Sequence, residues 1–443
     1  MIDRIVKRDG RIVPFNRDKI TFAILSAAIA VGGRDRATAE RVTDDVIRLL
    51  ERRAQPDSIP TVEEVQDLVE KALIERGHAR TAKAYIVYRY EHTLKRAGKR
   101  SLTYSADNIP YEKLWEALSW AVDHGCVSLA QIASAVREGS FPQLVQASEE
   151  FYRQELDGAL ERIQERLQDL RLVVVAGPSS SGKTTTTIKV EERLRAKGYS
   201  FVPINIDNFF LNLSSHPQDT LGDFDFETPQ ALDMGLIGDA LRGLLAGERV
   251  ELPFYNFKTG RREGSSGQLE LAPGQILLID SLHGLYPEMT EAVPEDKKFK
   301  LYIETLSQVK DSSGQFVRWA DIRLLRRMVR DMQFRNYSPK QTVQHWHFVR
   351  RSELRYIVPR LREADAIVNS FLPYELPIMR RRLAPLFPGF IEELAADPER
   401  SDATDRARRV HGFFQELPDW SDESVVPADS LLREFIGGSM YRY

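Results

Sequence analysis

Residues 172–184 read Leu-Val-Val-Val-Ala-Gly-Pro-Ser-Ser-Ser-Gly-Lys-Thr. The apolar run 172–176 is typical of a buried strand. The next eight residues, 177–184, match the phosphate-loop pattern, and a helix-forming stretch follows from Lys183. Because strand, glycine-rich loop and helix come in this order, the sequence predicts an α/β fold with a nucleotide site after the strand.

Each residue type in this loop has a chemical reason. Glycine at 177 and 182 permits backbone conformations that let successive N–H groups converge on a polyphosphate. Lys183 can reach the β- and γ-phosphates, and the Thr184 hydroxyl can ligate Mg²⁺. The following helix adds its positive N-terminal dipole. The predicted ligands are therefore ATP and Mg²⁺, and the predicted nucleotide-binding residues are Gly177, Pro178, Ser179, Ser180, Ser181, Gly182, Lys183, Thr184 and Thr185.

The composition is that of an ordinary enzyme with several domains. A chain of 443 residues suggests two or three domains, and 42% hydrophobic residues can form their cores. A net charge of −3 argues against a nucleic-acid or membrane surface as partner. The single Cys126 excludes an internal disulfide. With no leader and no membrane-length apolar run, the expected location is cytoplasmic, and a homo-oligomer stays open.

From residue 171 onward, apolar strands alternate with helical stretches. This alternation predicts a parallel sheet flanked by helices, the architecture of a P-loop kinase. The expected strands are 172–176, 201–206, 276–280, 298–303 and 366–369.

Two of these strands end in carboxylates. Asp207 follows the strand 201–206, where an acceptor substrate would meet the γ-phosphate. We expect it to accept the hydroxyl proton and to help hold the metal, although an Asp beginning a surface turn would look the same. Asp280 ends the strand 276–280 and is the second expected metal ligand, beside Thr184. An ordinary strand-terminal Asp is the alternative here.

A run of arginines suggests a lid over the phosphates. Arg327 and Arg330 lie three residues apart and would share one helix face, and Arg335 follows. Guanidinium groups match phosphate oxygens, so these three residues are expected to clamp the transferring phosphoryl group. A solvated basic helix is the alternative.

Several motifs in this order resemble uridine–cytidine kinases of the phosphoribulokinase/uridine kinase superfamily. The likeness spans about residues 165–375 and, in related proteins with an N-terminal regulatory domain, extends to 431–439. It implies that Glu227 holds the ribose hydroxyls of an acceptor nucleoside, and that Tyr255 and Phe257 surround its base. The motifs are the phosphate loop, Asp207–Phe210, Phe226–Asp233, Pro253–Phe257 and the arginine run.

The chain also departs from that family. A histidine that reads the pyrimidine is replaced by Gly260, a lid arginine by Tyr337, a glutamine by His345, and the strand-end glutamate by Asp280. These differences leave triphosphate handling intact and put base recognition in doubt. Another nucleoside and a smaller polyol with no pyrimidine are therefore alternative acceptors.

Residues 1–95 have the pattern of a small, mostly helical domain that opens with a β-hairpin. Asp9-Gly10 predicts the hairpin turn, Asn16 and Thr61 predict helix caps, and helices are expected over 37–53, 61–76 and 79–90. The segment resembles the ATP-cone domain, which binds ATP or dATP to regulate an attached activity. The residues expected to bind this regulatory nucleotide are Val6, Lys7, Arg8, Lys19 and Ile20.

The sequence thus predicts an ATP- and Mg²⁺-dependent small-molecule kinase that phosphorylates a hydroxyl group and is regulated by its ATP-cone. A sugar or polyol kinase of the phosphoribulokinase branch and a nucleotide-responsive regulatory protein with little turnover are the alternatives. The expected parts are a cone at 1–95, a helical connecting region at 96–165, and a kinase domain with a C-terminal extension at 166–443.

Overall fold

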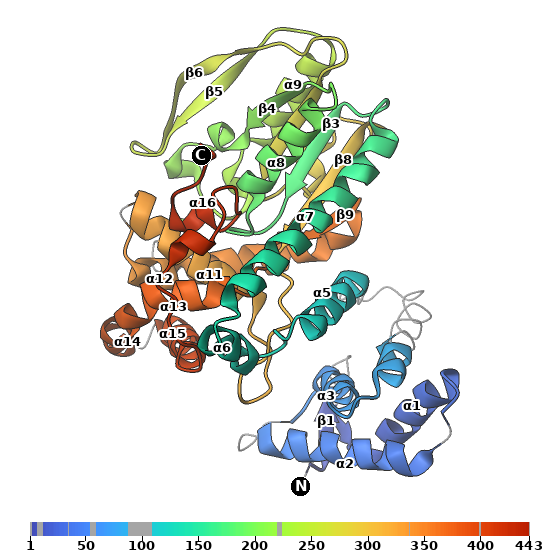
Figure 1. Cartoon of the computed structure of the whole chain (residues 1–443). Helices are drawn as coiled ribbons and strands as arrows, with labels where there is room; N and C mark the ends of the chain where they lie inside the picture. Colours follow the sequence, from blue (N-terminus) through green and yellow to red (C-terminus); the bar gives the residue numbers. More distant parts are fainter. Residues whose placement is uncertain are drawn as a thin grey trace. The chain divides into compact units, whose positions relative to one another are not determined.

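The computed structural model describes residues 2–6, 12–33, 35–53, 59–86, 109–218, 224–335, 337–397 and 400–442. The chain forms two compact units, Met1–Asp107 and Asn108–Tyr443, and each is described by itself (Figure 1). In these described ranges, no helix is long and apolar enough to cross a membrane.

The first unit is a short hairpin with a bundle of helices, as predicted. Strands β1 and β2 pair antiparallel, with Ile5 opposite Val13. The Asn16 side chain caps the first helix, and Thr61 forms a capping box with Glu64, so both predicted caps are confirmed. The predicted turn at Asp9-Gly10 lies outside the described residues. The elements are β1 Arg4–Val6, β2 Ile12–Pro14, α1 Arg17–Ala30, α2 Arg36–Arg53, α3 Val62–Glu75 and a further helix over 79–86.

The second unit is built on one parallel sheet, which confirms the predicted α/β class. Its strand order is β4-β7-β3-β8-β9, so the strand before the phosphate loop lies at the centre. All five predicted strands are present, with ends that differ by at most one residue. They are β3 Leu172–Ala176, β4 Phe201–Asn205, β7 Ile276–Ser281, β8 Lys298–Glu304 and β9 Ala366–Asn369.

Both faces of the sheet are covered. Val173 and Val175 of β3 face a core that includes Leu156 and Ile163 of α7 (Phe141–Arg166). The alternate residues of β3 face a second core with α9 (Met234–Leu245). The recurrence of apolar residues over 149–170 predicts a helix there. The observed helix α7 packs against the sheet, but it begins earlier, at Phe141, with a proline in its first turn, and ends at Arg166.

A β-hairpin extends from the sheet and was not predicted. Strands β5 (Val250–Asn256) and β6 (Arg261–Leu269) pair antiparallel, and β6 is exposed along most of its length. Because β6 contains Gly-Ser-Ser-Gly and has no alternation of apolar residues, it gave no strand signal. Other helices of this unit are α5 Tyr111–Asp123, α6 Leu129–Arg137, α8 Lys183–Arg195, α11 Trp319–Arg330, α12 Pro339–Ser352, α13 Glu375–Leu383 and α16 Arg433–Ile436.

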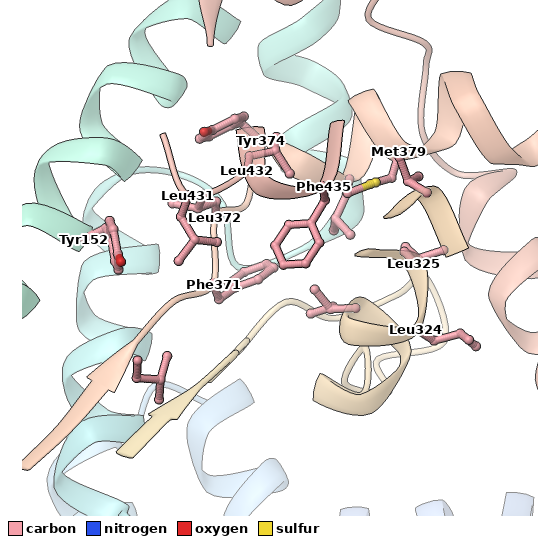
Figure 2. Close-up of a cluster of buried hydrophobic side chains, with 14 of the residues drawn as sticks. Tyr152, Leu324, Leu325, Phe371, Leu372, Tyr374, Met379, Leu431, Leu432 and Phe435 are labelled. Atoms are coloured by element: carbon pink, nitrogen blue, oxygen red, sulfur yellow. The ribbon is translucent and has the colours of Figure 1, made fainter. Parts of the chain in front are cut away.

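The C-terminal segment closes the core beside the phosphate loop. Figure 2 shows Leu431, Leu432 and Phe435 of this segment among buried side chains from distant parts of the chain. Leu431, Leu432 and Phe435 therefore belong to the core of the second unit. Their labelled neighbours are Tyr152, Leu324, Leu325, Phe371, Leu372, Tyr374 and Met379.

Candidate active site

The phosphate loop runs from the end of β3 into α8. Gly182 has a φ of +91°, and Ser180 adopts a φ of +61°, which is uncommon for a residue with a side chain. Among the described residues, Ser181 Oγ and Arg330 Nε are buried without a hydrogen-bond partner. Buried donors of this kind fit an anionic ligand such as a polyphosphate.

Two buried arginines of α11 donate hydrogen bonds to backbone carbonyls of the phosphate loop. Arg323 Nη1 donates to the Ser179 carbonyl at 3.2 Å, and Arg326 Nη1 donates to the Ser181 carbonyl at 3.3 Å. Arg323 is paired with Glu353, and Arg326 with Glu375 at 2.6 Å. The carbonyl groups of Ser179 and Ser181 are thus satisfied by side chains of α11.

The next turn of α11 carries two of the predicted lid residues on the same face of the helix. Arg327 Nη1 donates to Ser179 Oγ at 2.7 Å and to Glu227 Oε1 at 3.0 Å. Arg330 Nη2 donates to Ser180 Oγ at 3.3 Å. Burial, together with the charges of Arg335 and Arg327, lowers the pKa of Arg330 to about 10. An added anion would relieve this crowding of positive charge.

Arg335, the third predicted lid residue, lies farther out. It follows α11 in a short π-helical turn, Asp331–Arg335, and its half-exposed side chain is 3.6 Å from Asp331. Its charge acts on the pKa of Asp207, so it belongs to the same electrostatic surroundings.

The sheet brings the predicted metal ligands together. In the register of the strands, Asp280 of β7 lies opposite Val175 of β3 and Asn205 of β4. Thr184 Oγ1 donates to Asp280 Oδ2 at 3.0 Å. Burial raises the pKa of Asp280 to about 6, against the opposing effect of Lys183. A hydroxyl and a carboxylate at this distance are hard oxygen donors of the kind that Mg²⁺ prefers.

Lys183 and Asp207 lie at the same edge of the sheet. Lys183 Nζ donates to the Pro178 carbonyl at 3.2 Å. Asp207 lies in the single turn η2 (Ile206–Phe209), where the Asn205 side chain accepts a hydrogen bond from its N–H. Desolvation raises the pKa of Asp207, while the positive charges of Lys183 and Arg335 lower it. A carboxylate with a raised pKa is better suited to accept a proton.

Glu227, the predicted acceptor-binding acid, is fixed on three sides. Its carboxylate pairs with Arg327, and its backbone carbonyl accepts hydrogen bonds from His283 Nε2 at 2.9 Å and from Ser352 Oγ. His283 is fully buried, and burial lowers its pKa to about 3, so the ring is neutral. Sequence reasoning missed His283, since a lone histidine after a strand carries no distinctive signal.

The two predicted base-binding residues belong to an aromatic cluster centred on Phe210. Tyr255 lies 5.5 Å from Phe210 between ring centroids, and Phe257 lies 5.7 Å from it. Tyr255 is buried, whereas Phe257 is 60% exposed. Phe226 and His216 complete the cluster. The cluster offers an aromatic surface next to Asp207 and Glu227.

Gly260, expected to stand where the family has a histidine, has a backbone conformation that suits glycine. Gly260 has a φ of +67°, and a Cβ atom there would lie 2.9 Å from the side chain of Leu213. Its carbonyl accepts a hydrogen bond from the Leu213 N–H at 2.8 Å. The backbone at this position therefore favours glycine, and a base-reading side chain has no room there.

The residues expected to bind a regulatory nucleotide lie in the first unit. Val6 ends β1, where its N–H donates to the Pro60 carbonyl at 2.9 Å. Lys19 is exposed on α1, whereas Ile20 is turned into the helical core and is 7% exposed. Lys7 and Arg8 lie outside the described residues.

Each of the two units contains a segment that matches a known protein family. The pattern of the ATP cone domain matches residues 3–94, and that of the Phosphoribulokinase / Uridine kinase family matches residues 172–375. A uridine kinase of Deinococcus deserti is 29% identical over 198 residues, which are 44% of this chain and 86% of that protein. Uridine-cytidine kinase B of Dictyostelium discoideum is 30% identical over 199 residues, which are 44% of this chain and 73% of that protein.

A solved structure from Bacillus stearothermophilus, described as that of a possible uridine kinase, has a TM-score of 0.33 and 16% identity. It covers 49% of this chain and 98% of its own, and so low a score adds nothing to the sequence comparisons. Those comparisons are specific to the segment that contains the phosphate loop, Asp207, Glu227 and the arginines of α11. The chain belongs to the phosphoribulokinase/uridine kinase family of ATP-dependent kinases and carries an ATP-cone domain in its N-terminal unit.

Proposed function

We propose that this kinase transfers the γ-phosphoryl group of ATP to a hydroxyl of a nucleoside. One observation carries the proposal: the guanidinium of Arg327 contacts both Ser179 of the phosphate loop and the carboxylate of Glu227. A single side chain thus joins the nucleotide loop to the carboxylate expected to hold a ribose diol. This arrangement suits a reaction in which the two substrates must be aligned.

The proposed mechanism assigns one task to each group. Asp207 accepts the proton of the attacking hydroxyl, and its raised pKa favours that role. Lys183, Arg327, Arg330 and Arg335 stabilise the charge that develops on the transferring phosphoryl group. Thr184, Asp280 and Asp207 would hold Mg²⁺, which when bound neutralises charge on the β- and γ-phosphates.

The acceptor site is proposed to consist of Glu227 and the aromatic cluster. Glu227 would accept hydrogen bonds from two vicinal hydroxyls, and Tyr255 and Phe257 would contact a planar base. The lack of a base-reading side chain at Gly260 favours a second candidate, a sugar or polyol kinase, because such an acceptor has no base to read.

The proposal can be tested with a panel of nucleosides, sugars and sugar phosphates as acceptors, and with the variant Glu227→Gln. In the wild-type protein, ATP should be consumed only when a nucleoside is present. The substitution removes one charged acceptor from the site of the diol, so the nucleoside KM should rise about tenfold or more. The KM for ATP should stay within about twofold, because no change is made at the phosphate loop. Coupled measurement of ADP formation gives both constants.

Glu270→Gln is the matched control, since Glu270 is an exposed carboxylate that pairs only with Arg249 among its described contacts. It should leave both constants unchanged. Turnover with sugars or polyols alone would replace the nucleoside proposal by the second candidate. No turnover with any hydroxyl acceptor would favour a nucleotide-responsive regulatory protein.

We further propose that the N-terminal unit binds ATP or dATP and regulates the kinase. A chain that lacks residues 1–95 should retain phosphoryl transfer, lose one equivalent of bound nucleotide by calorimetry, and lose any non-hyperbolic response to ATP or dATP. Typical allosteric couplings of about 1–3 kcal/mol would change affinity about 5- to 150-fold, which is easily measured. Lys19→Ala in the full chain should weaken the same site. Identical stoichiometry and ATP curves in both chains would contradict a regulatory role.

A further inference from the structure

The C-terminal segment places a carboxylate on the phosphate loop. Glu434 Oε2 accepts hydrogen bonds from the backbone N–H of Thr185, at 3.2 Å, and from its Oγ1, at 2.8 Å. Thr185 is fully buried, and Glu434 is only 6% exposed. A negatively charged side chain thus occupies both hydrogen-bonding groups of a residue assigned to the nucleotide site.

The same donors suit a phosphate. A phosphate loop binds a polyphosphate through successive backbone N–H groups at the start of its helix, and Thr185 is the third residue of α8. A carboxylate and a phosphate are both anionic oxygen acceptors, and they repel each other at close range. The Thr185 N–H can therefore serve Glu434 or a phosphate oxygen, but not both well.

Apolar contacts hold the segment in this position. Leu431 packs directly on the loop, since a Cβ atom built on Gly182 would lie 2.3 Å from it. The ring of Phe435 lies under the guanidinium groups of Arg326 and Arg330, at 5.3 and 5.8 Å. Figure 2 shows Leu431, Leu432 and Phe435 buried among core side chains. Because these contacts anchor the segment, we expect only the Glu434 carboxylate, and not the whole segment, to move when a phosphate binds.

A second partner for the carboxylate lies nearby. Glu434 Oε1 is 3.7 Å from Arg330 Nη1, slightly beyond hydrogen-bonding distance. A small rotation would transfer the carboxylate from Thr185 to this guanidinium. The buried charge would then remain paired while the Thr185 donors turn to a ligand.

We propose that Glu434 is an internal competitor for the phosphates of the nucleotide and thereby sets the affinity of this kinase for ATP. The inference rests on the proposed nucleotide site at residues 177–185. It makes Glu434 a residue that lowers affinity in the ground state and takes no part in the transfer itself. Removal of the Glu434 carboxylate should therefore strengthen nucleotide binding. If Glu434 only supported the structure of the loop, its removal would weaken nucleotide binding.

The test measures binding at the loop alone, because the full chain has a second proposed nucleotide site. Hydrogen exchange of the amides of residues 183–186 is followed while a non-hydrolysable imido analogue of ATP is titrated with Mg²⁺. In Glu434→Ala and Glu434→Gln, the analogue concentration that gives half-maximal protection, the midpoint, should fall about five- to tenfold. The reason is that each substitution removes a charged group that competes with the phosphates for the Thr185 donors. The KM for ATP should fall in parallel.

Glu416→Gln is the matched control. Glu416 also accepts hydrogen bonds from a backbone N–H and the hydroxyl of one residue, Ser312, at 2.8 and 2.9 Å. It should leave the midpoint unchanged. Thermal melting shows whether each variant is folded, and Glu434→Gln, which keeps the shape of the side chain, serves if the alanine variant does not fold.

A midpoint that is unchanged or higher in Glu434→Gln would overturn the inference and make Glu434 a support of the loop. Lys183→Ala separates this failure from failure of the proposed function. If Lys183→Ala abolishes protection of residues 183–186 while Glu434→Gln leaves the midpoint unchanged, only the inference falls. If the analogue protects residues 183–186 equally in the wild type and Lys183→Ala, or protects neither, the proposed nucleotide site falls with it.

Discussion

Lys183→Ala should lower the rate of phosphoryl transfer about 10²- to 10³-fold at saturating ATP, while the protein stays folded. Lys183 is the single lysine that the phosphate loop contributes, and its ammonium would stabilise charge on the β- and γ-phosphates in the transition state. Loss of one such preorganised contact typically has an effect of this size. The measurement is ADP formation with a nucleoside acceptor, together with thermal melting.

Lys197→Ala is the control for this result. Lys197 is exposed just beyond the end of α8, so the same change of charge is made without contact with the loop. It should have wild-type activity. Wild-type turnover in Lys183→Ala would mean that the loop at 177–184 does not bind the nucleotide that reacts.

Asp207→Asn should lower kcat about 10²- to 10⁴-fold and change the KM for ATP only modestly. The substitution is nearly isosteric, but an amide cannot accept a proton from the attacking hydroxyl and carries no charge for a metal ion. The effect should therefore fall on the chemical step rather than on binding. Steady-state kinetics with varied ATP and varied acceptor separates the two constants.

Asp239→Asn, in which an exposed carboxylate of α9 is neutralised, provides the comparison. It should leave kcat unchanged. If kcat also survives in Asp207→Asn, then Asp207 is a turn residue of η2 and another group accepts the proton. If KM for ATP rises while kcat is preserved, Asp207 acts in metal or nucleotide binding alone.

The sheet and the placement of the loop could be predicted because their signals are local. The run 172–184 contains strand, loop and helix start within 13 residues, and each later strand is a short apolar run. The start of α7 was missed because the apolar residues used to place it begin at Phe151, although the proline in its first turn is a signal of a helix start. The hairpin β5–β6 was missed because its strands are exposed and lack a regular pattern of apolar residues.

The contacts that hold the phosphate loop from behind could not be predicted from the sequence. In a sequence, Arg323 and Arg326 look like part of a solvated basic helix. Their full burial depends on ion pairs of Arg323 with Glu304 and Glu353 and of Arg326 with Glu375. Glu434 lies 249 residues from Thr185 in the chain. Contacts at such separations depend on how the whole unit packs, and no local pattern reports them.

The buried arginines behind the loop have a thermodynamic consequence. Because Arg323 and Arg326 bond the carbonyls of Ser179 and Ser181, contacts within the protein fix the backbone of the loop at these two residues. The conformational entropy of that ordering is lost once, during folding, and does not reduce the free energy of each binding event. The backbone at Ser179 and Ser181 therefore adds little ordering cost to nucleotide binding.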